Sequence, residues 1–162
     1  MEQELRGRIP SRRLEINTLK DNIVCSGALF YAKSTKKILL LQKSNGKHRG
    51  TWSLVGGTVE AGENAWQSLV REIKEEIGDT PHIIKSMPLE TFVSNDKVFH
   101  FHTFLCVVDK EFIPTISNEH CGYSWTTIDL APKPLHQGLR SSFSNKNIRN
   151  KLETIFKVMD LI

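Results

Sequence analysis

The sequence has no hydrophobic run long enough to cross a bilayer, and its first residues lack the apolar segment of a secretory signal. Cysteine is scarce: Cys25, Cys106 and Cys121 are odd in number and show no CxxC spacing. This disfavours a disulfide framework and predicts reduced thiols in a cytoplasmic protein without membrane contact. Two of the cysteines, Cys25 and Cys106, occur in apolar stretches, as small core residues do.

Internal repeats and low-complexity segments are also missing from the 162 residues, a length that suits one domain with a sizeable core. The net charge of +4 would favour encounter with an anionic substrate, but ordinary surface charge is the simpler explanation, and nucleic-acid binding does not follow from it. We expect residues 1–20 to form a basic N-terminal extension that adds a strand or short helix or covers the substrate. Residues 21–162 should form a single domain.

Apolar and β-branched stretches predict strands at 23–32, 36–43, 51–55, 82–93, 97–108 and 122–129. A helical pattern begins at Asn64 and stops at Gly78, and a second amphipathic helix is expected within 145–162. The segments 44–50 and 111–121 are expected to be loops. Prolines and a glycine between 132 and 138 predict an irregular connection.

The segment 56–79 organises the chain, because it joins a glycine-rich stretch to a helix. Gly56, Gly57 and Gly62 are expected to adopt positive φ and tight turns. In the helix that follows, one apolar stripe should face the core, with Trp66 and Val70 widening it. That stripe consists of Ala65, Leu69, Ile73 and Ile77.

Three acidic residues of this helix, Glu72, Glu75 and Glu76, have the i, i+3, i+4 spacing that brings their carboxylates to one surface. Glu76 falls almost within the apolar arc, where desolvation and mutual repulsion are costly. A compensating positive charge is therefore expected. A hard divalent cation such as Mg²⁺ satisfies this requirement, and Arg71 and Lys74 are alternative partners. A solvated, salt-bridged helix face is the simpler alternative.

The segment resembles the signature of the Nudix hydrolase superfamily, which spaces glycine, glutamate and an Arg-Glu-x-x-Glu-Glu core at fixed intervals. Here the pattern is Gly57, then Glu63, then Arg71 to Gly78, and only Asp79 departs from it, at a position where an aliphatic residue is usual. We call residues 57–79 the box. The many fixed positions make a chance match improbable.

The resemblance implies an α/β Nudix fold, in which a mixed β-sheet is sandwiched between helices (α/β/α). It also implies metal-dependent hydrolysis of the phosphoanhydride bond of a nucleoside diphosphate linked to another moiety, as in a nucleoside triphosphate or a nucleotide sugar. The alternatives are a dinucleoside polyphosphate hydrolase, an RNA-end hydrolase, or a catalytically silent domain that binds a nucleotide or a partner. We expect a small nucleotide as the partner rather than nucleic acid, and leave the oligomeric state open, with a homodimer among the options.

By the same resemblance, Glu72, Glu75 and Glu76 are expected to bind Mg²⁺ or Mn²⁺, together with a backbone carbonyl near Gly57. Glu63 and Arg71 are expected to form an ion pair that braces the glycine loop and orients Glu72. The catalytic base is either a box glutamate such as Glu72 or a glutamate on a late loop. Glu119 occupies the latter region. A purely structural role, in which its carboxylate caps nearby backbone groups, is an equally good interpretation.

Residues outside the box give weaker signals for the substrate. His100 and His102 share one face of a predicted strand, where they are metal ligands or, more simply, line a polar sheet face near the substrate. Tyr123 is one of several aromatics that could stack on a base, although such residues are more often core. The others are Phe30, Tyr31, Phe101 and Trp125. His120 could assist its neighbour Glu119, but a surface histidine is the simpler expectation.

Overall fold

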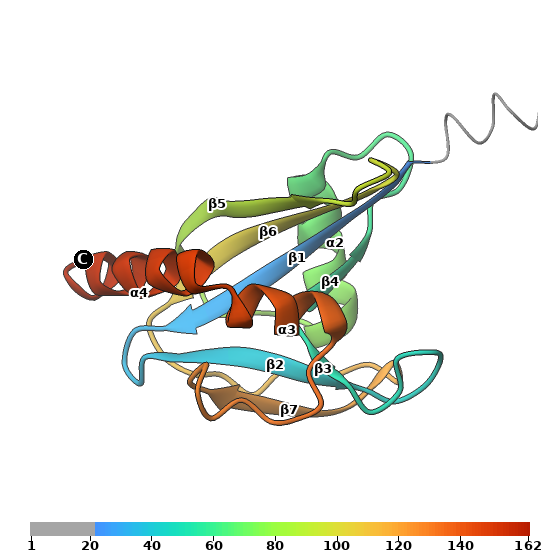
Figure 1. The fold of residues 1–162 in the computed structure, drawn as a ribbon. Helices are drawn as coiled ribbons and strands as arrows, with labels where there is room; N and C mark the ends of the chain where they lie inside the picture. Colours follow the sequence, from blue (N-terminus) through green and yellow to red (C-terminus); the bar gives the residue numbers. More distant parts are fainter. Residues whose placement is uncertain (1–21) are drawn as a thin grey trace, which may run out of the picture.

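A mixed seven-stranded sheet carries helices on both of its faces (Figure 1). The computed structural model describes residues 22–162, so the expected N-terminal extension lies outside the described residues. The α/β arrangement with a sheet between helices is confirmed. Among the described residues, no helix is both long and apolar enough to span a bilayer.

The sheet is built around a central strand, β1 (Ile23–Ala32), which runs parallel to β6 (Phe99–Val108) over its whole length. The other strands are β2 (Lys37–Lys43), β3 (Trp52–Ser53), β4 (Val55–Thr58), β5 (Ile83–Val93) and β7 (His120–Thr126). β4 pairs with β1 and β7 pairs with β2, both antiparallel, so β7 forms one open edge. These pairings place the glycines of β4 against the middle of the sheet.

Two separate cores form because successive side chains of a strand point to opposite faces. Ala28 and Phe30 of β1 pack on the face covered by α2 (Ala65–Ile77). Leu29 and Tyr31 pack on the other face, beneath α3 (Gln137–Ser144) and α4 (Lys146–Asp160). Each sheet face therefore has its own helical layer (Figure 1).

Helix α2 has the ends that its sequence predicts. Asn64 caps its N-terminus and forms a capping box with Gln67, because each side chain accepts from the backbone N–H of the other. Gly78 ends it with a φ of 73° and donates its N–H to the carbonyl of Lys74. A residue with a Cβ would be strained in this conformation, which explains the glycine.

The sequence does not reveal α3, whose region was expected to be irregular. Its N-cap is His136, which accepts from the N–H of Gly138 at 3.4 Å, instead of the usual Ser, Thr, Asp or Asn. The helix has only eight residues, and just Leu139 and Phe143 are buried. The sequence of α3 therefore has neither a usual N-cap residue nor an apolar periodicity long enough to predict a helix.

Gly56 and Gly57 serve a different purpose from the one expected, because neither has a positive φ and both lie within β4. A Cβ on Gly56 would lie 2.1 Å from the carbonyl oxygen of Ser26 on β1. A Cβ on Gly57 would lie 2.6 Å from the carboxyl group of Glu72 on α2. The two glycines therefore allow close approach, whereas Gly62, with a φ of 84°, supplies the turn.

We predict that Gly56→Ala destabilises the protein by about 2–3 kcal/mol, because the new methyl group would overlap the backbone of a central strand. The measurement is the free energy of unfolding from urea titration. Gly122→Ala is the matched control, since its Cβ would meet Gln42 at an ordinary 3.6 Å. Equal stability of the two variants would contradict the close-approach explanation.

Candidate active site

The acidic end of α2 meets the 109–119 loop and the start of β7. The loop donates N–H groups to the last carbonyls of the helix, from Thr115 to Ile77 at 3.0 Å and from Ser117 to Glu76 at 3.2 Å. These bonds satisfy carbonyls that a helix end leaves without partners. They also bring Glu119 and His120 next to Glu76.

Arg71 is the centre of the charged network along the box. Its Nε and Nη2 bind both carboxylate oxygens of Glu63, at 2.8 and 3.0 Å, and Nη2 also donates to the carbonyl of Thr58 at 3.1 Å. Its Nη1 contacts Glu72 at 2.9 Å and Glu75 at 3.3 Å. The expected ion pair between Glu63 and Arg71 is present, and hydrogen bonds from Arg71 hold the pKa of Glu63 below its ordinary value.

Glu72 and Glu76 come together against the sheet. The carboxyl group of Glu72 occupies the space that a side chain on Gly57 would need, and Glu76 shares a hydrogen bond with Glu72. Glu76 is only 4% exposed. Burial, followed by the hydrogen bond and negative charge of Glu72 and the charge of Glu119, raises the pKa of Glu76 to about 9.

This arrangement fits a divalent cation. The Oε2 atom of Glu76 is buried without a hydrogen-bond partner, and it lies beside a second carboxylate. Oxygen donors of this kind suit Mg²⁺ or Mn²⁺, whose charge would offset the repulsion between the two glutamates.

The structure brings together only part of the expected ligand set. Within residues 22–162, no three acidic, histidine or cysteine side chains already lie at a distance where they could share a metal ion. Glu75 has a side chain that is 59% exposed and contacts Arg71 instead. Glu119 is close enough for its charge to raise the pKa of Glu76.

His120 is not the surface residue that was expected, since its side chain is 2% exposed. Its Nε2 lies 3.8 Å from Oε2 of Glu76, and its Nδ1 has no partner. Burial, helped by the positive charge of Lys43, lowers the pKa of His120, so the ring is neutral at pH 7. The expected strand at 122–129 started two residues too late, because β7 begins at His120.

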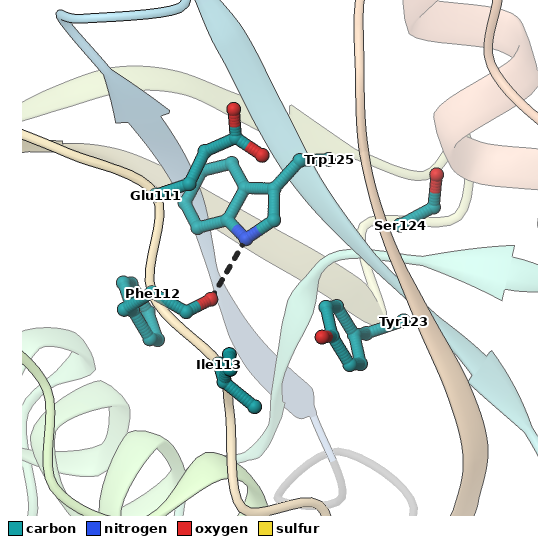
Figure 2. Close-up of a pocket in the computed structure, with 6 residues that line it drawn as sticks. All are labelled: Glu111, Phe112, Ile113, Tyr123, Ser124 and Trp125. Atoms are coloured by element: carbon teal, nitrogen blue, oxygen red, sulfur yellow. Dashed lines mark hydrogen bonds between the residues drawn. The ribbon is translucent and has the colours of Figure 1, made fainter.

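The candidate substrate residues lie on two different strands, His100 and His102 on β6 and Tyr123 on β7. His100 contacts the carbonyl of Lys97 at 3.0 Å, and His102 contacts the hydroxyl of Thr91 at 2.9 Å. In the part of the chain that the structure describes, neither is within 4.0 Å of a box carboxylate. Tyr123 lines a hollow between β7 and the 109–119 loop (Figure 2).

The sequence model of the NUDIX domain matches residues 22–145. The chain is 30% identical over 121 residues to a dihydroneopterin triphosphate diphosphatase from Haemophilus influenzae, covering 64% of this chain and 73% of that protein. It is 32% identical over 111 residues to the nucleoside triphosphatase NudI from Escherichia fergusonii, covering 61% and 78%.

Other similarities are shorter or concern the fold alone. A match to Nudix hydrolase 6 from Arabidopsis thaliana is 43% identical over 54 residues, which are 32% of this chain, but the chain spans only 19% of that protein. The crystal structure of RenU, a Nudix hydrolase from M. smegmatis, superimposes with a TM-score of 0.67 at 20% identity, covering 83% of this chain and 88% of that one. At such identity the superposition shows a shared fold.

We predict that the metal-free protein loses stability as the pH rises from about 7 to 9, a range in which free histidines are already neutral. The pKa of Glu76 is about 9 in the folded state against an ordinary value of 4.5. The folded state therefore retains a proton that the unfolded state has released, and raising the pH favours unfolding.

The measurement is urea unfolding in EDTA at several pH values. Glu76→Gln should remove most of this pH dependence, because glutamine does not titrate. The Cys106 thiol, whose pKa burial raises to about 12, accounts for the remaining slope near pH 9. Glu153→Gln, an exposed change on α4, is the control and should keep the full pH dependence. A slope in Glu76→Gln equal to that of the unmodified protein would show that another group is responsible.

Proposed function

The chain belongs to the NUDIX domain family, and from this premise we propose that it hydrolyses a nucleoside triphosphate to a nucleoside monophosphate and pyrophosphate. The observation that carries the proposal is the buried carboxyl group of Glu76 next to Glu72, beside the Arg71 network. Two relatives with names that specify triphosphate substrates support the choice of a triphosphate.

Divalent metal ions are general in Nudix hydrolases, and we propose Mg²⁺ here, with Mn²⁺ as an alternative. Glu72 and Glu76 would hold the metal, with the backbone near Gly57, and Glu75 would join them by exchanging its contact with Arg71. A metal bound there would neutralise pyrophosphate charge and lower the pKa of bound water.

Arg71 and Glu63 act as positioning residues in this proposal. The bidentate contact between them ties the loop before α2 to the helix, and the same guanidinium fixes one oxygen of Glu72. Replacing either partner would free the loop and leave a charge without its counterpart.

Glu119 is the base that the geometry favours. Its backbone is fixed, because the N–H of Ser44 donates to the Glu119 carbonyl at 2.9 Å and the Ser44 hydroxyl donates to Asn118 at 2.6 Å. The carboxylate itself is exposed and near Glu76. It would accept a proton from water as the water oxygen bonds to phosphorus and the bridging P–O bond breaks, which leaves pyrophosphate.

Nucleotide sugars and dinucleoside polyphosphates are the alternative substrates. A silent domain is disfavoured because the acidic positions of the box are all filled, by Glu63, Glu72, Glu75 and Glu76. We propose that the enzyme acts in the cytoplasm on a compact substrate with one nucleoside, and not on long capped RNA.

We predict hydrolysis of nucleoside triphosphates in a phosphate-release screen with Mg²⁺, using added pyrophosphatase to convert the product. EDTA should abolish the activity, and excess Mg²⁺ should restore it. In ¹⁸O-labelled water, mass spectrometry should find the label in one product only, which identifies the phosphorus attacked. Undiminished turnover in EDTA, or activity confined to capped RNA, would refute the proposal.

We predict that Glu119→Gln lowers kcat at least 100-fold with little change in KM, since the amide cannot accept the proton. Glu153→Gln on α4 has the same chemical change far from the site and should retain full activity. If Glu119→Gln turns over normally, the base is a glutamate of the box.

A further inference from the structure

A hollow of about 520 Å³ lies between the 109–119 loop and the edge strand β7 (Figure 2). It is lined by Glu111, Phe112, Ile113, Tyr123, Ser124 and Trp125. The volume is within the range of small-molecule sites, and the lining combines aromatic rings with the polar groups of Glu111, Tyr123 and Ser124.

The floor of the hollow is rigid before any ligand arrives. The indole N–H of Trp125 donates to the carbonyl of Phe112 at 2.9 Å, which ties the strand to the loop. The two rings also pack edge to face with centroids 5.3 Å apart, and Phe112 packs in the same way on Phe30 of β1 at 5.6 Å. Tyr123 is less constrained, because it is 39% exposed.

Both walls of the hollow continue along the chain to the acidic centre, the name we use for Glu72 and Glu76. His120, the first residue of β7, lies 3.8 Å from Glu76, and Tyr123 is three residues further along the strand. At 3.3 Å per residue this separation is about 10 Å. The opposite wall continues to Ser117, which donates to the carbonyl of Glu76.

The hollow also faces the same side of the sheet as the box. Trp125 packs against the core layer that contains α2, and Tyr123 precedes it by two residues, so both side chains point to that face. A single nucleoside triphosphate with its phosphates beside Glu72 and Glu76 can therefore reach Tyr123 without crossing the sheet.

The lining selects for a flat ring with N–H donors. The exposed Tyr123 ring offers a stacking surface, and Ile113, which is 82% exposed, offers an apolar edge. The Glu111 carboxylate accepts hydrogen bonds and donates none, while the N–H of Trp125 is already used. In Figure 2 the Glu111 carboxylate and the Tyr123 ring lie on opposite sides of the indole.

We infer that this hollow binds the heterocycle of the substrate, with Tyr123 as the stacking residue and Glu111 as the acceptor for adjacent ring N–H groups. A base with the amino-imino edge of guanine meets this requirement, whereas adenine presents a ring acceptor next to its amino group. The inference rests on the proposed function, because it assigns a binding site for one part of the substrate that Glu72 and Glu76 would help to hydrolyse.

Binding, measured by calorimetry, tests the inference without requiring turnover. The probes are the α,β-methylene analogues of GTP and ATP and, as a ligand without a ring, inorganic tripolyphosphate, all with Mg²⁺. Tyr123→Ala should weaken binding of the GTP analogue about tenfold, the scale of one stacked base, and leave tripolyphosphate binding unchanged. Tyr123→Phe should restore the affinity, because the ring is kept.

Glu111→Gln should reduce the preference for the GTP analogue over the ATP analogue about tenfold. Phe92→Ala, which removes an exposed aromatic on β5, is the control and should change neither affinity. Circular dichroism spectra would show that each variant is folded.

Three results would overturn the subsite. Tyr123→Ala could bind the GTP analogue as tightly as the unmodified protein, it could lose tripolyphosphate binding equally, or the unmodified protein could bind neither nucleotide analogue. Failure of the proposed function is distinguishable, because ring-dependent binding through Tyr123 without hydrolysis would refute only the catalytic proposal.

Discussion

The acidic site depends on the contacts of one side chain, the guanidinium of Arg71. One planar cation joins the loop before α2, through Glu63 and the carbonyl of Thr58, to two glutamates of the helix itself. Its donors are arranged as a rigid fork, so the contacts fix direction as well as distance, which a lysine ammonium could not do. The same contacts reduce repulsion among carboxylates that would otherwise face one another. Glu76 lies outside this compensation, and its burial beside Glu72 raises its pKa to about 9.

The second constraint on the site is the close approach of β4 to β1 and to helix α2. Gly56 lies against Ser26 in the β1–β4 ladder, and the missing side chain of Gly57 leaves room for Glu72. A larger residue at Gly56 would push β4 away from β1, and one at Gly57 would push Glu72 and its helix away from the sheet. Charge and space thus act together, because Arg71 draws the helix and loop together and the glycines permit the distance that results.

The sequence alone predicts those features of the fold and the site that depend on neighbouring residues in the chain. Asn64 and Gly78 mark the ends of α2 because capping depends on a few adjacent residues, and the buried position of Glu76 follows from helical periodicity. The purpose of Gly56 could not be predicted, since it depends on a strand 30 residues earlier. The burial of His120 was missed for a related reason: it follows from the 109–119 loop docking on the end of α2, a contact that leaves no mark in local sequence.

The elements around the cleft differ in how freely they can change. The box is held against the interior of the sheet and by the Arg71 network. Among the described residues β7 pairs with one strand only. The 109–119 loop contacts the α2 layer through the backbone N–H groups of Thr115 and Ser117 and through the apolar side chains of Phe112 and Ile116. Exposed side chains of this edge, such as Tyr123 and Ile113, can therefore vary more freely than His120, which is buried against Glu76. In the function proposed above, the hydrolytic step would stay constant while Tyr123 and its neighbours would determine which ring is accepted.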